Sequence, residues 1–245
     1  MTSHTQTPHQ LNQTLAGKSA LEILQSATEL FHPRLAFASS FGAEDVVVID
    51  LLAQITPAVR VFTLDTGRLH EETYDVMEAI RRKYGLVIDT VFPDRAKVES
   101  LENSKGFYSF RESIENRKEC CAIRKLEPLR RALQGSDAWI TGLRREQSVT
   151  RTGLDVVQAD EGNPGKLKFN PLADWSQAQV WEHIRANDVP YNKLHDLNFP
   201  SIGCSPCTRA VALGEDLRAG RWWWELPEQK ECGLHSAKPQ PAASV

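Results

Sequence analysis

The spacing of the five cysteines is the strongest indication of chemistry in this sequence. Cys120 and Cys121 are adjacent, and Cys204 and Cys207 form a C-x-x-C pair within the turn-rich stretch FPSIGCSPCTR. If folding brings both pairs together, four thiolates suit either a tetrahedral zinc ion or an iron-sulfur cluster. Adjacent cysteines fit one small ion awkwardly because their side chains diverge, which favours a cluster while leaving structural zinc open. Buried cysteines without a ligand are the minority interpretation.

The remaining cysteine, Cys232, stands alone in KECGLHSAK near the end of the chain. A nucleophilic thiolate needs exposure and a positive neighbourhood that lowers its pKa. Lys230 and His235 supply only a slight positive neighbourhood. On these residues alone, an incidental cysteine is at least as good an interpretation as a nucleophile.

The segment SSFG at 39–42 is a candidate anion-binding loop. It lies between a predicted strand and a predicted helix, where backbone amides and serine hydroxyls can face an anion at the helix N-terminus. It lacks the lysine of a Walker A loop, and Glu44 and Asp45 in the first helical turn would oppose a triphosphate. An ordinary connecting loop is an equally good interpretation.

Cationic side chains form a second set of candidates. Lys125 follows Cys121 by four positions, so on an α-helix both would occupy one face and the ammonium group would lie beside a bound metal. Guanidinium groups are preferred partners of phosphate and sulfate oxygens, and several stand at predicted loop ends: Arg144, Arg145, Arg151, Arg218 and Arg221. We interpret the other conspicuous rings as structural, surface or packing residues: His70, His183, His195, Trp222, Trp223 and Trp224.

The elements that must position these residues alternate between strands and helices. Apolar runs, helical spacing and the C-terminal cap at Gly85 predict strands at 34–38, 59–64 and 86–92, and helices at 44–54 and 68–85. This βαβαβ order predicts an α/β fold, with a mainly parallel sheet and helices on both faces. The ligand crevice of such a fold lies at the carboxyl ends of the strands.

The second half of the chain is less regular. We expect no regular element in the charged stretch 97–119, and a helix that resumes at Cys120. Pro128 is predicted to open a second helical segment. A strand at 138–142 then leads into a basic polar loop.

The end of the chain divides into one more helix and a tail. Asp174 and Gln177 are predicted to form a capping box for a helix at 175–188. From about 226, Pro, Gly, Ser and Ala replace apolar periodicity. We therefore predict a single catalytic domain over 1–225 and a mobile tail over 226–245 that carries the last cysteine.

Composition restricts the classes of function. With 245 residues and 41% hydrophobic residues, the chain can bury one sizeable core. Its net charge of -3 argues against a nucleic-acid partner, so an anionic ligand must meet a local cationic cluster. We find neither a signal peptide nor an apolar stretch that could span a bilayer, and expect a cytoplasmic protein without a membrane partner. In a reducing compartment, cysteines indicate metal binding or thiol chemistry rather than disulfides.

Taken together, these motifs resemble the assimilatory sulfonucleotide reductases, specifically the cluster-containing adenylyl-sulfate (APS) reductases. The match covers nearly the whole chain after about residue 20, through SSFGAED, LDTGRLHEETY, CC-x-x-RK, WITGLRREQS, GCSPCTR, LRAGRWWWE and the terminal ECGLH. The resemblance implies the adenine-nucleotide α-hydrolase-like fold that this family shares with PP-loop ATPases. SSFGAED departs from the SGGxDS loop of those ATPases, which fits the loss of ATP hydrolysis.

The resemblance also implies a site. Cys120, Cys121, Cys204 and Cys207 would hold one [4Fe-4S] cluster. The nucleotide would contact Ser39, Ser40, Gly42, Leu64, Thr66 and Gly142, and its phosphosulfate would meet Lys125, Arg144, Arg151, Arg218 and Arg221. Cys232 would attack the sulfur and displace AMP, leaving an S-sulfocysteine that thioredoxin or a glutaredoxin-like dithiol reduces to release sulfite. Our own hypothesis, separate from the resemblance, is that the cluster acts by position or charge through Lys125, and a homo-oligomer is left open.

Three alternatives stay open on the sequence. The related PAPS reductases lack the two cysteine pairs, so APS is the favoured substrate, although some cluster-bearing relatives accept both nucleotides. A PP-loop enzyme that thiolates tRNA could also carry a cluster, but the altered SSFG loop and the absence of a basic balance count against it. A non-enzymatic, zinc-stabilised nucleotide-binding module would leave Cys232 without a role.

Overall fold

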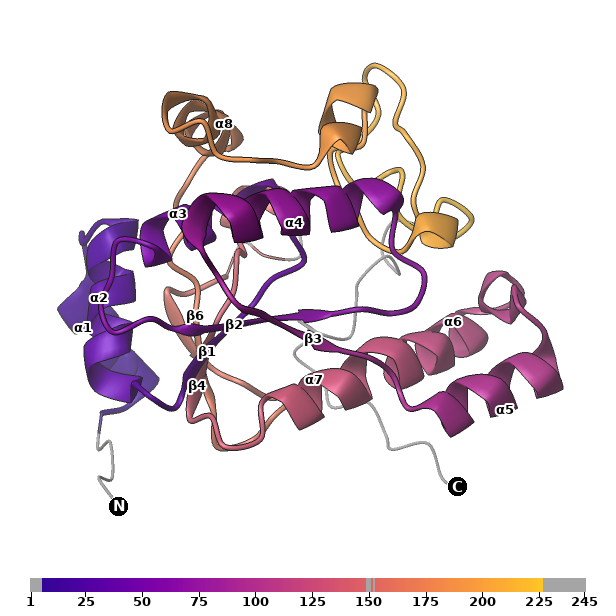
Figure 1. Ribbon diagram of the computed structural model, residues 1–245, viewed down its shortest axis with the longest axis horizontal. Helices are drawn as coiled ribbons and strands as arrows, with labels where there is room; N and C mark the ends of the chain where they lie inside the picture. The colour runs from indigo at the N-terminus through magenta and orange to yellow at the C-terminus, as the bar shows by residue number, and fades with distance from the viewer. Residues whose placement is uncertain (1–5, 149–150, 152, 227–245) are drawn as a thin grey trace.

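The computed structural model describes residues 6–148, 151 and 153–226, and its first two helices lie beside the sheet (Figure 1). These helices, α1 (Pro8–Leu15) and α2 (Ala20–Phe31), have no counterpart in the sequence prediction, and each begins with a capping box. The Asn12 side chain exchanges two hydrogen bonds with the backbone of Val157, at 2.8 and 2.9 Å. Helix α1 thereby covers an edge strand whose backbone groups would otherwise be open to another chain.

Six strands form one sheet in the order β3-β2-β1-β4-β6-β5. Their bounds are β1 (Leu35–Ala38), β2 (Arg60–Leu64), β3 (Ile88–Val91), β4 (Ala138–Ile140), β5 (Val157–Ala159) and β6 (Leu167–Phe169). All neighbours run parallel except β5 and β6, which are antiparallel. The predicted mainly parallel sheet is confirmed. Because β1 lies between β2 and β4, the strand order reverses there, and the loops that follow these strands diverge to leave a crevice.

The sheet is covered by helices on both faces, as predicted. Leu35 and Phe37 of β1 belong to the larger core, whereas Ala36 joins a second core with Phe62 and Trp139. This alternation follows from the two-residue period of a strand. Helices α3 (Ala43–Leu52) and α4 (Glu71–Tyr84) lie on one face, and α7 (Glu127–Ala132) lies on the other (Figure 1). Gly85 ends α4 in the left-handed conformation, at φ 61°, as its cap position predicts.

Helix α3 is buried on nearly every side and anchors the loop that precedes it. Val46, Val47 and Val48 are all fully buried, because α3 packs between the sheet and α8 (Gln177–Ala186). His183 of α8 contacts Asp50 of α3, with 2.7 Å between the ring nitrogen and the carboxylate. His183 is therefore structural, as interpreted from the sequence.

The expectation of an irregular stretch at 97–119 is wrong. That stretch lies within α5 (Arg95–Lys105), η1 (Ser109–Arg111) and α6 (Ile114–Cys121). Leu101 is the only residue of α5 that is buried, and Lys105 joins Glu119 of α6 through an ion pair of 2.6 Å. Polar caps and ion pairs rather than an apolar stripe support these helices, so apolar periodicity does not mark them.

Two further expectations for local structure need correction. After α6 the chain continues through Ala122–Leu126 as a π-helix rather than an α-helix, before α7 begins with Pro128 in its first turn as predicted. Helix α8 is capped by Ser176 and Gln179, whose reciprocal hydrogen bonds are 3.2 and 2.8 Å, and not by Asp174 and Gln177. Ser176 has the extended backbone that an N-cap requires.

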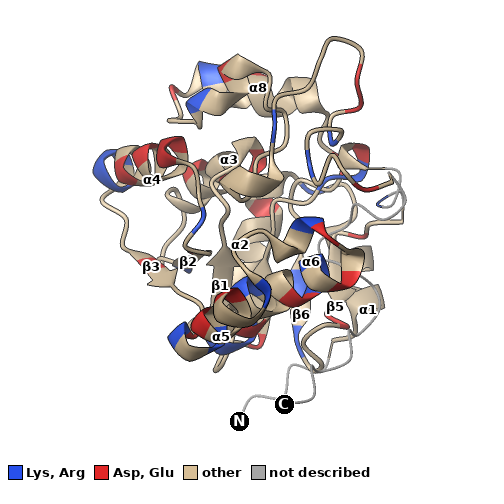
Figure 2. Cartoon of the chain, turned by 90° about the vertical axis from the view of Figure 1, so that its right-hand side faces the viewer, with Lys and Arg blue, Asp and Glu red and all other residues tan. Residues whose placement is uncertain are grey.

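Acidic and basic side chains are interspersed on the outer helices. Figure 2 shows both signs along α4, α5 and α6. In α4 the acidic residues Glu71 and Glu72 occupy the first turn, and a basic run ends the helix, which complements the helix dipole. Within the described part of the chain, no helix combines the length and the apolar character needed to cross a membrane.

Candidate active site

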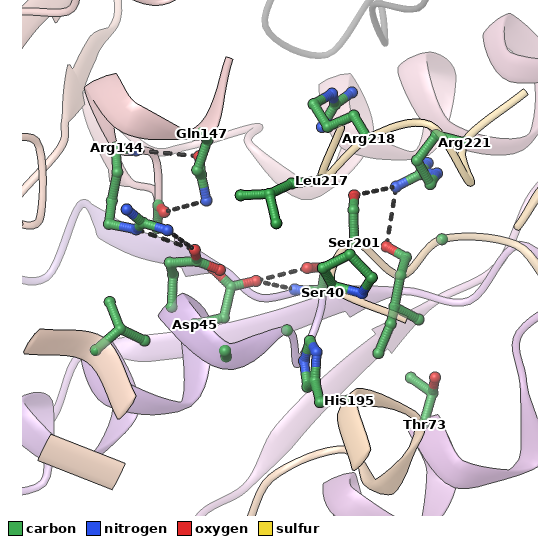
Figure 3. Close-up of a pocket in the computed structure, with 18 of the residues that line it drawn as sticks. Ser40, Asp45, Thr73, Arg144, Gln147, His195, Ser201, Leu217, Arg218 and Arg221 are labelled. Atoms are coloured by element: carbon green, nitrogen blue, oxygen red, sulfur yellow. Dashed lines mark hydrogen bonds and ion pairs between the residues drawn. The ribbon is translucent and has the colours of Figure 1, made fainter. Parts of the chain in front are cut away.

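A cavity of about 720 Å³ lies at the carboxyl ends of β1, β2 and β4, where the strand order reverses. Its size suits a small-molecule ligand such as a nucleotide. Every residue that the sequence implies as a substrate contact lines this cavity: Ser39, Ser40, Gly42, Leu64, Thr66, Lys125, Gly142, Arg144, Arg151, Arg218 and Arg221. Figure 3 shows Arg144 on one side, Arg218 and Arg221 on the other, and Ser40 and Asp45 between them.

The SSFG loop faces a carboxylate of its own chain. The backbone N–H and the hydroxyl of Ser40 both donate to one oxygen of Asp45, at 2.5 and 2.8 Å. Burial raises the pKa of Asp45 to about 6, although the two hydrogen bonds from Ser40 act in the opposite direction. A phosphate or sulfate that approaches the loop must therefore compete with Asp45 for the donors of Ser40.

The floor of the cavity requires a glycine where β4 ends. A Cβ atom added to Gly142 would lie 2.2 Å from Oδ1 of Asp45 and 3.3 Å from its backbone nitrogen. The end of β4 and the first turn of α3 thus approach each other without a side chain between them. This close approach joins two of the predicted motifs, SSFGAED and WITGLRREQS, in one wall.

Arg144 is buried and already paired. Its Nε and Nη2 atoms donate to Oε1 of Glu44 at 3.0 and 2.8 Å, and its side chain is 3% exposed. Gln147 accepts hydrogen bonds from the backbone N–H of Arg144 and from the side chain of Arg151, which places both arginines on one wall. Arg145, the other arginine of this loop, pairs with a carboxylate elsewhere and does not line the cavity.

Arg221 lies on the opposite wall in a tightly packed environment. Its Nη1 atom donates to the carbonyl of Ile202 at 3.0 Å and to Ser201 at 3.4 Å, while its buried Nε has no hydrogen-bond partner. A Cβ atom at Gly203 would lie 2.3 Å from the guanidinium group, so this glycine leaves the space that the arginine occupies. The unpartnered nitrogen shows that Arg221 retains donor capacity.

The fold brings the two cysteine pairs to the same end of the molecule. Cys120 and Cys121 end α6, whereas Cys204 is the N-cap of η6 (Ser205–Cys207) and Cys207 is its last residue. All four are free thiols. The Sγ atom of Cys204 lies 3.3 Å from the hydroxyl of Thr66, and Cys204 also lines the cavity.

Electrostatic coupling shows that these thiols are near one another. Burial raises the pKa of Cys207 to about 12, and the neighbouring charges of Cys204 and Cys120 add to this effect. Burial by itself raises the pKa of Cys204, but the positive charge of Lys125, the hydroxyl of Thr66 and the charges of Arg221 and Arg124 together outweigh it and lower that pKa. Cys204 therefore has more thiolate character than Cys207.

Lys125 lies near these thiols, but the helix that holds it is of a different type from the one expected. The four-residue spacing from Cys121 assumed an α-helix, and the intervening segment is π-helical. Lys125 nevertheless acts electrostatically on Cys120, Cys204 and Cys207, and it lines the cavity. Its ammonium group is thus close enough to both the thiols and the cavity to influence each.

Several residues that help to shape the site were not singled out from the sequence. Arg124 is 5% exposed and donates to the carbonyl of Thr66 at 2.7 Å, while Glu102 pairs with both Arg124 and Arg68. This network ties the loop after β2 to the π-helix that follows the cysteines. The adjacent basic pair in CC-x-x-RK was the available signal for Arg124. The ring of His195, interpreted as structural or surface, lines the cavity.

The predicted nucleophile Cys232 lies outside the described residues. The chain just before it is firmly held, because Glu225 accepts hydrogen bonds from Arg117 of α6 at 2.9 and 2.8 Å. The two side chains are 2% and 3% exposed, and the Arg117 guanidinium lies 4.7 Å from the ring centre of Trp222. Glu225, seven residues before Cys232 in the sequence, therefore lies against the helix that ends in Cys120 and Cys121.

Comparisons with known proteins agree with this geometry. Residues 34–210 match the model of a protein family described as the phosphoadenosine phosphosulfate reductase domain. The chain is 50% identical over 229 residues to the adenosine 5'-phosphosulfate reductase of Allochromatium vinosum, covering 92% of this chain and 88% of that protein. It is 53% identical over 205 residues to the protein of the same name from Neisseria meningitidis serogroup B, covering 83% of each. The crystal structure of phosphoadenylyl-sulfate (PAPS) reductase from Candida auris, in a phosphate complex, shares its fold with a TM-score of 0.73 and 29% identity, covering 86% of this chain and 99% of that one.

Proposed function

The chain belongs to the phosphoadenosine phosphosulfate reductase domain family, and we propose that it reduces adenosine 5'-phosphosulfate (APS) to sulfite and AMP in assimilatory sulfate reduction. The observation that carries this proposal is a single cavity that joins the SSFG loop, the cationic side chains and Cys204. Such a cavity can hold a nucleotide whose phosphosulfate faces positive charge beside a thiol cluster.

APS rather than PAPS is the proposed substrate. The relatives at 50% and 53% identity are named for APS, whereas the structure named for PAPS is 29% identical. The chain also has the two cysteine pairs that the related PAPS reductases lack, and this supports the same choice. An enzyme that uses both nucleotides equally would require a revision of this assignment.

The four paired cysteines are proposed to hold one [4Fe-4S] cluster. Among the residues that the structure describes, no three His, Cys, Asp or Glu side chains are grouped tightly enough for a single metal ion. A cluster is larger than one ion and holds its thiolates further apart, so a looser set of four free thiols suits it better. The positive charges of Lys125, Arg124 and Arg68 act on Cys120 and would favour a thiolate-bound, negatively charged group. When bound, the cluster would supply fixed negative charge and would tie α6 to η6.

The side chains of the cavity would bind and polarise the substrate. The cavity carries one cation beside the thiols, Lys125, and two on the wall opposite Arg144, which are Arg218 and Arg221. Cations at these positions would stabilise the charge that develops on the phosphosulfate oxygens. The SSFG loop would offer the donors of Ser40 to the same anion. These contacts would orient the sulfur and leave AMP, a stable phosphate, as the leaving group.

Cys232 would perform the covalent step. Its thiolate attacks the sulfur of the sulfate group, a sulfur–sulfur bond forms, and the bond from that sulfur to the phosphate oxygen breaks with its electron pair on AMP. A dithiol of thioredoxin or a glutaredoxin-like protein then attacks Sγ of Cys232, releasing sulfite. The second thiol of the dithiol resolves the mixed disulfide, so the two electrons come from the reductant. A dithiol reductant implies a reducing compartment, and we propose the cytoplasm.

The test is to incubate anaerobically purified protein with APS, without reductant, and to measure intact mass. The expected result is a sulfonate adduct on the wild-type protein that is absent from Cys232→Ser and is discharged by reduced thioredoxin. PAPS in a parallel sample should give less adduct at equal concentration. Iron and sulfide analysis of the same sample tests the cluster. Cluster-loaded protein that forms no adduct from APS would refute the proposed reaction.

A further inference from the structure

His195 lines the cavity, and both nitrogen atoms of its ring are closed off from solvent. Neither Nδ1 nor Nε2 makes a hydrogen bond of normal geometry, although a backbone group of Phe199 lies close enough to raise the pKa of the ring. In the view of Figure 3 the ring is drawn below Ser40 and Asp45 and to the left of Thr73, and all four residues line the same cavity. Leaving buried polar atoms without partners costs free energy, so such a group in a native structure calls for an explanation, such as a ligand.

The backbone around His195 is fixed before any ligand arrives. His195 lies in η5 (Lys193–Leu197), whose first turn is capped by the side chain of Asn192 at 3.0 Å. Asn192 is 1% exposed and also donates to the buried hydroxyl of Thr73 at 3.2 Å. The turn ends at Asn198, which adopts the left-handed conformation.

Aromatic packing rather than hydrogen bonding holds the ring itself. Its centre lies 5.2 Å from that of Trp181, at an interplanar angle of 82°, and Trp181 packs in the same edge-to-face manner against Tyr191. These contacts hold the imidazole at the wall of the cavity without using its nitrogens. Because both nitrogens are closed off from water, a ligand in the cavity reaches them only through a small turn of the ring.

The charge state of the ring indicates which part of a nucleotide it suits. Burial lowers the pKa of His195, although Glu44, the Phe199 backbone and Asp196 act in the opposite direction. A neutral imidazole carries one donor and one acceptor. The cations of the cavity suit the phosphosulfate, whereas a neutral donor and acceptor suits an uncharged group of the nucleoside. A hydroxyl matches it best, since a hydroxyl can complement either tautomer.

We propose that His195 is a substrate-binding residue that hydrogen-bonds a ribose hydroxyl of the nucleotide. This role rests on the proposed function, because it takes an adenine nucleotide as the occupant of the cavity. It adds a neutral contact to the cationic contacts that the sequence motifs imply. It also gives a role to two buried ring nitrogens that make no hydrogen bond of normal geometry within the protein.

AMP, the proposed product, is the probe for the test. In His195→Phe the ring shape is retained and both nitrogens are removed, so AMP should bind about tenfold more weakly in calorimetric titration. The unfolding temperature without ligand should not fall, because the variant loses no hydrogen bond within the protein. In steady-state assays with APS the KM should rise with kcat unchanged, since the ribose is remote from the reacting sulfur.

The matched control is His70→Phe. His70 is another half-buried histidine whose buried Nε2 lacks a partner and whose pKa is lowered by burial, but it does not line the cavity. It packs edge to face against Phe199, as His195 does against Trp181. His70→Phe should bind AMP as tightly as the wild type.

Deoxynucleotides identify the contacted group. If His195 bonds the 2'- or 3'-hydroxyl, 2'-deoxy-AMP or 3'-deoxy-AMP should bind the wild type and His195→Phe equally, because the contact is already lost. Equal binding of AMP to both proteins would overturn the proposal, as would a tenfold difference that persists with both deoxy analogues. Wild-type protein that binds neither AMP nor APS would instead refute the proposed function.

Discussion

Neutralising Glu225 should destabilise the protein strongly. Glu225→Gln keeps the size of the side chain but removes the charge that accepts two hydrogen bonds, at 2.9 and 2.8 Å, from Arg117. Both side chains are almost fully buried, so the variant removes the carboxylate charge from beside a buried guanidinium that packs on Trp222. Breaking a buried pair from one side costs about 3–5 kcal/mol. We expect about 3 kcal/mol, the lower end of that range, because the amide oxygen of the glutamine can still accept a hydrogen bond from Arg117.

Urea unfolding is the assay for this prediction. A loss of about 3 kcal/mol corresponds to a midpoint lower by about 1 M or more. The matched control is Glu99→Gln, which breaks the Arg95–Glu99 pair whose side chains are 89% and 54% exposed, and it should leave the midpoint unchanged. The double variant Arg117→Met with Glu225→Leu should recover most of the loss, since neither charge is left unpaired. A Glu225→Gln midpoint equal to that of the control would refute the reasoning.

Three further predictions concern the cavity. Burial raises the pKa of Asp45 to about 6 from 3.8, so the folded state holds this proton more tightly and Asp45 costs stability as pH rises from about 4 to about 6. The urea midpoint of Asp45→Asn, measured relative to that of the wild type, should therefore rise as the pH is raised from about 4 to about 6. A difference between the two midpoints that does not change with pH would contradict this. Gly142→Ala should weaken AMP binding, measured by calorimetry, and lower the unfolding temperature, because the added Cβ would lie 2.2 Å from Asp45. The control is Gly153→Ala, whose added Cβ would meet nothing within 4 Å and should change neither quantity. Lys125→Ala should slow adduct formation from APS at unchanged iron content, and full activity would exclude a role for its charge.

The first half of the fold could be predicted because local signals and tertiary packing agree there. β1, the SSFG loop and α3 follow from an apolar run, a polar break and a second apolar run, and Gly85 ends α4 in the conformation that its position predicts. Parallel strands with both faces buried read as continuous apolar segments. Agreement between levels of structure is the condition under which a sequence can be interpreted locally.

The second half could not be predicted in the same way because long-range contacts determine it. α6 buries Arg117, whose partner Glu225 lies 108 positions away, and no local pattern reveals that pair. The π-helical turn after Cys121 is equally invisible to a period of 3.6 residues. Strand β5 is short and half exposed, and the side chain of Asn12 from the distant α1 covers it.

The substrate-contact residues were accessible from motifs, whereas the role of His195 was not. Each motif names residues that are adjacent in sequence, and the fold then brings the motifs to one cavity. His195 belongs to a short 3-10 turn, and only its unpartnered nitrogens distinguish it from a packed histidine. That property depends on the absence of a nearby partner in space, which a single sequence cannot show.

The acidic residues of SSFGAED explain why this loop is unsuited to a triphosphate and which anion the cavity suits instead. Glu44 neutralises Arg144, and Asp45 occupies the donors of Ser40. An anion that enters the cavity therefore replaces internal carboxylates rather than water, and its net binding energy is the difference between the two sets of partners. A triphosphate would bring several charges close to two carboxylates in the first turn of α3, where they oppose it. A phosphosulfate carries less charge and can draw on the unpartnered donor of Arg221 on the opposite wall, so this geometry favours the smaller anion.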